Sequence, residues 1–303
     1  MEDKYLKIIK DNVGGSILIG EPLADHTTYR VGGKADCLIC PDSPKGAGWL
    51  YNYAKKESIP LTILGAGSNV IAPDAGIRGI VLKLQNDAAE IAFSGNNMIV
   101  ADAGVTLIDL ARAAAEKGLC GFEPIAGIPG TVGGAVFMNA GTKEGDTASL
   151  LEEVEVITGG KNRTFSPDEL AFGYRTSAFQ KTDWLILRAV FRLQKGSPEH
   201  IRKGIDKIFA ERQEKFPLDS PNAGSVFKRP PGDYAGRLIE EADCKGLTIG
   251  GASVSNRHAN FIITSGNATA SDIVELISMM RRRVFEKFGI YLELENEILD
   301  SFS

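Results

Sequence analysis

Three short segments of this chain carry side chains that could do chemistry: FGYRTSAF, PNAGSVFKRP and YLELENEIL. They contain Arg175 among aromatic and small residues, Ser225 after Asn-Ala-Gly, and Glu295 in an alternating run. A serine and a carboxylate invite comparison with a hydrolase triad, but that triad needs a base between them. None of the three histidines lies in these segments. The sequence therefore disfavours a hydrolase and leaves another role for the hydroxyl open.

Each segment also has an ordinary structural interpretation. Arg175 fits a structural salt bridge, and Ser225 fits a turn hydroxyl that is satisfied by backbone groups. The alternation from Tyr291 to Leu299 predicts a strand that places three carboxylates, Glu293, Glu295 and Glu297, on one solvent-exposed face. Residue types and spacing alone leave both interpretations open.

Two glycine-rich stretches are the clearest local signals. One is GIPGTVGG, from Gly127 to Gly134, and the other is LGAGSNV, which follows the apolar run Leu61–Leu64. Crowded glycines indicate positive φ angles or a ligand close to the bare backbone, and main-chain N–H groups suit a phosphate. Neither stretch has the spacing of the nicotinamide dinucleotide fingerprint. A plain tight turn remains the alternative for each.

Hydrophobic periodicity and capping residues predict a mixed succession of helices and strands. Ser43 and Pro44 are typical of a helix start, and Gly118 and Gly289 are typical of helix ends. The predicted helices are 44–56, 106–117, one through Ile201 to Phe209, and one through Ile273 to Phe288. The predicted strands are 61–64, 79–84, 154–158, 184–193 and short segments within 247–263.

The polar break Lys195-Gly-Ser-Pro198 predicts a domain boundary, with a small α+β domain after it. The net charge of −5 argues against binding to nucleic acid. No apolar run nears the roughly 20 residues of a membrane helix, and the polar start predicts a cytoplasmic protein. The four cysteines are too few for a disulfide scaffold, so we expect free thiols and no metal site.

With these motifs in this order, the chain resembles the UDP-N-acetylenolpyruvoylglucosamine reductase family over nearly its whole length. The resemblance rests on HTTYRVGGKAD, LGAGSNV, GIPGTVGGAVFMNAG, GYRTSAF, PNAGSVFKRP, AGRLIEEADCKGLTIGGASVSNRHANFII and LELENEI, in that order. It implies a two-part FAD-binding unit of the vanillyl-alcohol oxidase type over 1–196 and a substrate domain over 197–303. Five residues separate Ala178 from Trp184, so the chain resembles members that lack a tyrosine-bearing insertion.

The resemblance also implies an activity and its residues. NADPH would reduce FAD, and the enolpyruvyl group of a UDP-sugar would then accept hydride, giving UDP-N-acetylmuramate for peptidoglycan. Ser225 matches the proton donor, and Arg175 and Glu295 match the residues that stabilise the enolate. The UDP-sugar would lie near Lys215, Lys228, Lys245, His258 and Asn260. Because the two glycine-rich stretches are the chain's anion cradles, we expect the FAD pyrophosphate on Gly65, Ala66, Gly67, Ser68, Asn69, Gly127, Ile128, Pro129, Gly130, Thr131, Gly133 and Gly134.

Some assignments stay open. Glu297 also fits the family's terminal glutamate pattern, shifted by two residues, although counting from Gly289 selects Glu295. Arg229 and the segment 141–146 depart from the commoner family sequence. Another FAD-dependent oxidoreductase of the same fold is the main alternative, and a non-enzymatic flavin- or UDP-sugar-binding module is a further one. The oligomeric state is unknown from sequence.

Overall fold

The computed structural model describes residues 3–95 and 97–300 and divides the chain into two compact units. The first unit comprises Met1–Ile19, Cys37–Ala66 and Gly79–Ala210. The second comprises Gly20–Asp36, Gly67–Arg78 and Glu211–Ser303. Both units are discontinuous, so they do not coincide with the predicted ranges 1–196 and 197–303. Those ranges stay a prediction about which ligand each part binds.

The largest sheet lies in the first unit and is antiparallel throughout. Its order is β10 (Lys161–Phe165), β9 (Leu151–Thr158), β11 (Leu185–Arg192), β7 (Met98–Asp102) and β6 (Ile91–Ser94). A four-stranded sheet has the order β1 (Gly15–Pro22), β2 (Lys34–Pro41), β5 (Ile77–Lys83) and β3 (Leu61–Leu64). A pair of two-residue strands is formed by β12 (Gln194–Lys195) and β8 (Leu119–Cys120).

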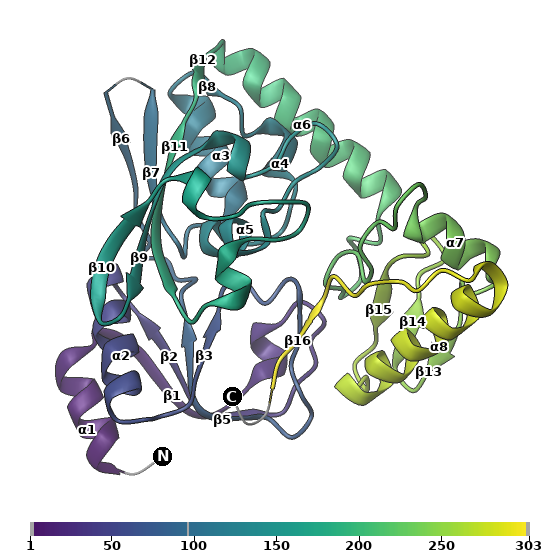
Figure 1. Ribbon diagram of the computed structural model, residues 1–303, viewed down its shortest axis with the longest axis horizontal. Helices are drawn as coiled ribbons and strands as arrows, with labels where there is room; N and C mark the ends of the chain where they lie inside the picture. The colour runs from purple at the N-terminus through teal and green to yellow at the C-terminus, as the bar shows by residue number, and fades with distance from the viewer. Residues whose placement is uncertain (1–2, 96, 301–303) are drawn as a thin grey trace. The chain divides into compact units, whose positions relative to one another are not determined.

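The helices of the first unit cover these sheets, and Figure 1 shows α3, α4 and α5 gathered on one side of the five-stranded sheet. α5 packs on β11 and β7, and α2 packs on β11. Phe122, Phe179 and Phe191 fill the core beneath them. The helices are α1 (Asp3–Asn12), α2 (Pro44–Lys56), α3 (Leu107–Glu116), α4 (Glu123–Ala126) and α5 (Val132–Met138). Short 3₁₀ turns of this unit cover Ala148–Leu150, Pro167–Glu169 and Ala178–Lys181, and a further one, Leu23–His26, belongs to the second unit.

The second unit is a small α+β body in which α8 lies across a three-stranded antiparallel sheet (Figure 1). Val226, Phe227 and Leu292 are buried in its core beside Met280 of α8. Its elements are α7 (Ala235–Glu241), α8 (Ala270–Phe288), β13 (Thr248–Ile249), β14 (Ala252–Val254), β15 (Ile262–Thr264), and the parallel pair β4 (Val70–Ile71) and β16 (Glu297–Ile298). α6 (Pro198–Lys215) begins at the last residue of the predicted polar break, and its residues up to Ala210 belong to the first unit.

Most predicted elements are confirmed. Ser43 caps α2 by accepting from the Gly46 N–H, Thr106 caps α3, and Gly289 ends α8 with φ of +69°. The predicted strand from Tyr291 to Leu299 is wrong, because only Glu297–Ile298 form a strand. Upstream of it, the segment meets its neighbour through an isolated bridge between Leu294 and Phe227. The three carboxylates therefore do not share one face of a regular strand.

Candidate active site

The two glycine-rich stretches meet in the first unit. A Cβ atom added to Gly65 would lie 2.6 Å from Oγ1 of Thr131, so a side chain at Gly65 would collide with the second stretch. The Thr131 hydroxyl is also the N-cap of α5, where it accepts from the Gly134 N–H at 3.3 Å. Gly65 is therefore a glycine because the two loops approach closely, as two halves of one anion cradle would.

The second stretch is only partly a loop. Gly133 and Gly134 lie in the first turn of α5, whereas Gly130 has φ of +153°, a conformation that side chains disfavour. Its backbone is fixed to the 103–107 segment, because Leu107 N–H donates to Gly130 O and Gly133 N–H donates to Ala103 O. A valine at Gly130 would strain the backbone and could not report on a ligand alone.

Gly134 is the better probe of the predicted FAD site. It is exposed, and an added Cβ would meet only Thr131 Oγ1, at 3.5 Å. Gly134→Ala should keep or raise stability by about 0.5–1 kcal/mol, because alanine suits a helix better. We expect flavin affinity to fall at least ~10-fold, about 1.4 kcal/mol, if a phosphate lies on this turn. Titration of the apoprotein with FAD measures this.

The matched control is Gly266→Ala. Gly266 is exposed and an added Cβ there has no atom within 4 Å. It should leave flavin affinity unchanged. If Gly134→Ala bound flavin with wild-type affinity, the first turn of α5 would not be part of the FAD site.

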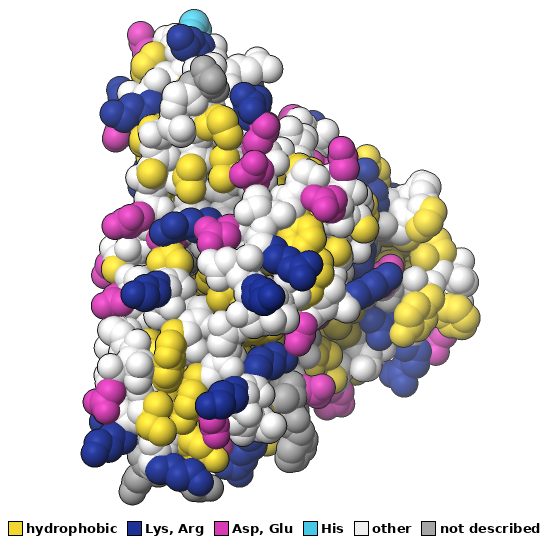
Figure 2. Space-filling model, turned by 60° about the vertical axis from the view of Figure 1, so that its left-hand side comes forward, with side chains coloured by type: hydrophobic (Ala, Val, Ile, Leu, Met, Phe, Trp, Pro, Cys, Tyr) yellow, Lys and Arg dark blue, Asp and Glu magenta, His cyan; other side chains and the backbone are white. Residues whose placement is uncertain are grey.

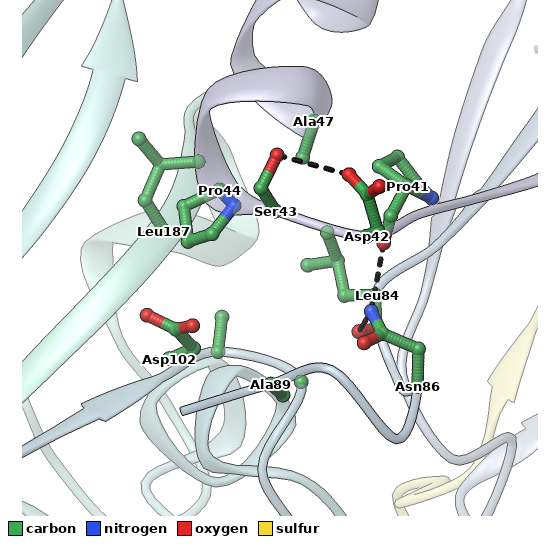
Figure 3. A pocket seen from close by; sticks show the side chains of 12 residues that line it. Pro41, Asp42, Ser43, Pro44, Ala47, Leu84, Asn86, Ala89, Asp102 and Leu187 are labelled. Atoms are coloured by element: carbon green, nitrogen blue, oxygen red, sulfur yellow. Dashed lines mark hydrogen bonds between the residues drawn. The ribbon is translucent and has the colours of Figure 1, made fainter. Parts of the chain in front are cut away.

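The first unit also contains a small cavity, and Figure 3 shows its lining side chains. It lies between the end of β2, the start of α2 and the segments that follow β5 and β7. Ser43 donates to Asp42, and the Asn86 amide donates to Pro41 O at 2.8 Å (Figure 3). Its volume is about 20 Å³, enough for about one water molecule. This cavity therefore does not hold a substrate.

Arg175 sits in a tight turn of the first unit. Gly173 and Thr176 close the turn through two backbone hydrogen bonds, and Arg175 has φ of +54°, the left-handed region. Its guanidinium donates to Gly141 O at 2.8 Å and stacks over the Tyr174 ring at 5.3 Å. A non-glycine residue with positive φ is uncommon, and such strain concentrates at functional sites.

Two amide side chains hold this turn. The Asn139 amide donates to Gly173 O at 3.0 Å, and the Gln180 amide donates to Arg175 O at 3.1 Å. Asn139 itself ends α5 in the left-handed conformation and is 3% exposed. The long glycine stretch and the Arg175 turn are thus linked through α5 and Asn139.

Ser225 follows a sharp turn in the second unit. Gly224 has φ of +73°, and its N–H donates to the Asn222 side chain at 3.0 Å. Val226 and Phe227, which come next, are fully buried. Within residues 3–95 and 97–300 the Ser225 hydroxyl has no hydrogen-bond partner. The structure therefore does not support the interpretation of a turn serine whose hydroxyl is satisfied by the backbone.

Glu295 lies on the chain segment next to Ser225. Its N–H donates to Val226 O at 2.8 Å, and its carbonyl accepts from the Asn69 amide at 2.9 Å. Glu295 is half-buried, whereas Glu297 is exposed within β16. The structure brings Glu295, rather than Glu297, against the serine segment.

The predicted lysines make ion pairs. Lys228 is three residues from Ser225, and its Nζ lies 2.6 Å from Glu293 Oε1. Lys245 Nζ lies 2.6 Å from a Glu240 carboxylate oxygen. Lys215, exposed at the end of α6, lies 4.0 Å from Glu211. Their proposed contacts with the UDP-sugar stay predictions.

His258 and Asn260 differ in what they contact. The His258 ring packs against the rings of Phe216 and Phe261, with centroids 5.2 and 5.1 Å away. The Asn260 side chain is buried and pairs with both backbone groups of Phe227, at 3.0 and 2.8 Å. Any effect of Asn260 on the sugar would act through the Ser225 segment, because both ends of its amide are engaged.

The environment of His258 predicts a pH effect on stability. Burial, and then the nearby Lys245, hold the pKa of His258 below its usual 6.5. The unfolded chain therefore binds this proton first, and stability is lost as the pH falls from about 7 through 6.5 toward the folded pKa. His258→Phe should flatten that slope in denaturant titrations between about pH 7 and pH 5.

His200→Phe, at an exposed position of α6, is the control for replacing a histidine. An equal slope in His258→Phe and wild type would contradict the expectation.

Two residues of the second unit escaped the sequence analysis. Asn296 is a buried amide that occupies, two residues after Leu294, a position where the alternation otherwise holds apolar residues. This polar residue at an otherwise apolar position could have indicated a buried side chain with specific hydrogen-bond partners. Arg212 stacks over Phe216, and its buried Nε has no hydrogen-bond partner among the described residues. Nothing in the sequence distinguishes it from the other charges of α6.

The surface and composition of the chain bear on ligand class. Figure 2 shows basic and acidic side chains interspersed over the face it displays, without a continuous basic track. In residues 3–95 and 97–300 no helix is long and apolar enough to cross a membrane. No cluster of three or more metal-ligating side chains occurs in that part of the chain either. The four cysteines are free thiols, two of them in β2.

Family comparisons cover most of the chain. The model of the UDP-N-acetylenolpyruvoylglucosamine reductase C-terminal domain matches residues 216–299, and the FAD binding domain model matches residues 35–164. UDP-N-acetylenolpyruvoylglucosamine reductase of Caldanaerobacter subterraneus subsp. tengcongensis is 43% identical over 98% of this chain and 97% of its own. The enzyme of the same name from Geobacillus thermodenitrificans is 43% identical over 98% of both chains.

Solved structures agree with these matches. A UDP-N-acetylenolpyruvylglucosamine reductase from Thermus caldophilus covers 95% of this chain and 100% of its own, with a TM-score of 0.79 and 35% identity. An alkyldihydroxyacetonephosphate synthase covers 64% of this chain and 41% of its own, with a TM-score of 0.50 and 16% identity, which concerns the fold alone. The predicted fold class, a two-part FAD-binding unit of the vanillyl-alcohol oxidase type with a small α+β domain, is confirmed.

Proposed function

The chain belongs to the UDP-N-acetylenolpyruvoylglucosamine reductase family, and from this premise we propose its reaction. It reduces UDP-N-acetylglucosamine enolpyruvate to UDP-N-acetylmuramate with NADPH and FAD, supplying a peptidoglycan precursor. A cytoplasmic location is part of the proposal, because four free thiols suit a reducing compartment.

One observation carries the proposal beyond family membership: an accessible serine hydroxyl is held beside a glutamate. The Ser225 hydroxyl has no hydrogen-bond partner within the described residues. Val226 follows Ser225 in the chain, and its carbonyl accepts from the Glu295 N–H at 2.8 Å. A proton donor and a carboxylate on adjacent, hydrogen-bonded segments suit protonation of a carbon centre. Another flavoenzyme of this fold would need neither the serine nor its PNAGS context.

The cofactor fits the glycine stretches. A side chain at Gly65 would collide with Thr131, and glycine keeps the backbone bare where the two stretches meet, which suits a pyrophosphate. We assign the FAD pyrophosphate to residues 65–69 and to the glycine stretch that ends at Gly134. When bound, FAD would carry hydride from NADPH to the enolpyruvyl group.

The chain's own residues would then handle charge and proton. Arg175 would pair with the substrate carboxylate and stabilise the negative charge that develops as an enolate, since an arginine fork matches a carboxylate and acts most strongly where water is excluded. Glu295 would polarise the same group. Ser225 would give its hydroxyl proton to the carbon, and the charge of Lys228, three residues away, would ease that loss.

The test is reaction of the purified protein without oxygen. Its flavin absorbance should bleach with NADPH and recover when UDP-N-acetylglucosamine enolpyruvate is added, with UDP-N-acetylmuramate as product. Bleaching without recovery would reject the proposed substrate. A protein that binds no flavin would reject the proposal altogether.

A further inference from the structure

Asn296 is a buried polar side chain beside the candidate site of the second unit. It is 3% exposed and follows Glu295 directly. Its Oδ1 accepts from the Tyr29 hydroxyl at 3.0 Å, and Tyr29 is fully buried. A buried amide that lost these partners would be costly, about 1–3 kcal/mol for each unsatisfied group.

The other end of the amide faces three oxygens. Nδ2 lies 3.0 Å from Asn69 Oδ1, 3.0 Å from Ala223 O and 3.3 Å from Ser225 O. An amide nitrogen has two hydrogens, so one of them is shared between two of these acceptors. The orientation of Asn296 is fixed, because the reverse would set its oxygen against three acceptors.

These contacts join three parts of the candidate site. Asn69 belongs to the first glycine stretch, and its own amide donates to Glu295 O at 2.9 Å. Ser225 follows Gly224, which has positive φ and would be mobile without bracing. Because the Ser225 hydroxyl has no hydrogen-bond partner in the described residues, the Ser225 backbone determines where it lies. The backbone of Ser225 is held through its carbonyl by Asn296.

We propose that Asn296 is a positioning residue that fixes the Ser225 carbonyl, and thereby its hydroxyl, relative to Glu295 and Asn69. The inference rests on the proposed function, because it takes Ser225 as the proton donor. A positioning role differs from a purely structural one in its expected effect. Loss of Asn296 should slow substrate protonation more than it slows flavin reduction by NADPH.

Asn296→Asp separates the two ends of the amide. The carboxylate keeps an acceptor for Tyr29 but loses both donors to the three oxygens. In the flavin-loaded enzyme, we expect reoxidation by substrate to slow at least ~10-fold, while flavin reduction by NADPH changes less than ~3-fold. Amide hydrogen exchange in residues 223–227 should accelerate.

Tyr29→Phe is the matched control, because it removes the partner at the opposite end of the same amide. It should lower the unfolding temperature yet leave the ratio of the two half-reactions and the exchange of 223–227 near wild type. If the aspartate variant does not fold, Asn296→Ala replaces it, since water can enter the space.

Two outcomes are decisive. An unchanged half-reaction ratio and unchanged exchange in a folded Asn296 variant would overturn the positioning role. Wild-type enzyme that fails to reoxidise with the enolpyruvyl substrate would instead reject the proposed function, so the two failures are distinguishable.

Discussion

Ser225→Ala should leave flavin reduction by NADPH nearly intact and slow flavin reoxidation by the enolpyruvyl substrate by more than the roughly 10²–10⁴-fold of ordinary acid–base assistance. The first half-reaction needs no proton at the enolate carbon, whereas the second does. The hydroxyl has no partner among the described residues, so its removal breaks no hydrogen bond there. Stability should therefore stay close to wild type.

Rapid-mixing absorbance of the flavin measures each half-reaction separately. Ser225→Cys should recover part of the rate, since a thiol is a stronger acid but larger. Equal slowing of both halves in Ser225→Ala would mean that the residue shapes the flavin site. The proton donor would then have to be sought among Lys228 and Glu295.

Local signals were sufficient for elements whose ends are set by nearby residues. Ser43 and Pro44 start α2 as predicted, and Gly289 ends α8, because capping depends on atoms within one helical turn. The glycine stretches were also visible, although Gly65 proved to be a glycine for contact with Thr131 rather than for its φ angle.

The parts that escaped prediction depend on distant partners. Glu297 pairs with Val70, and Asn296 bonds Tyr29 across 267 residues of sequence. Alternation from Tyr291 onward looked like a strand, yet its neighbour Phe227 contributes a single bridge there. Which polar side chain fills an inward position cannot be read from spacing, because its partners are set by the folded chain.

Arg175→Gly should uncouple stability from activity. Position 175 has φ of +54°, which costs about 1–2 kcal/mol for a residue with a side chain and nothing for glycine. The guanidinium bond to Gly141 O that this change removes is worth a similar amount, so these two effects offset each other in the unfolding temperature. The enolate would lose its countercharge, and reoxidation of the flavin by substrate should slow roughly 10²–10³-fold.

Ala171→Gly is the control for the backbone effect, because Ala171 is exposed, lies in the same segment and also has positive φ, +47°. It relieves the same kind of strain without removing a charged group, so its two half-reactions should match wild type.

Calorimetry and flavin absorbance on both variants separate the effect on stability from the effect on reoxidation. If Arg175→Gly kept the wild-type reoxidation rate, the strained backbone would have to serve the turn itself, and the carboxylate's partner would lie elsewhere. If Arg175→Gly failed to fold while Ala171→Gly folded, the guanidinium bond to Gly141 would be needed for the structure. Arg175→Lys keeps the positive charge but loses the planar fork, so its reoxidation rate would then show whether charge or geometry matters.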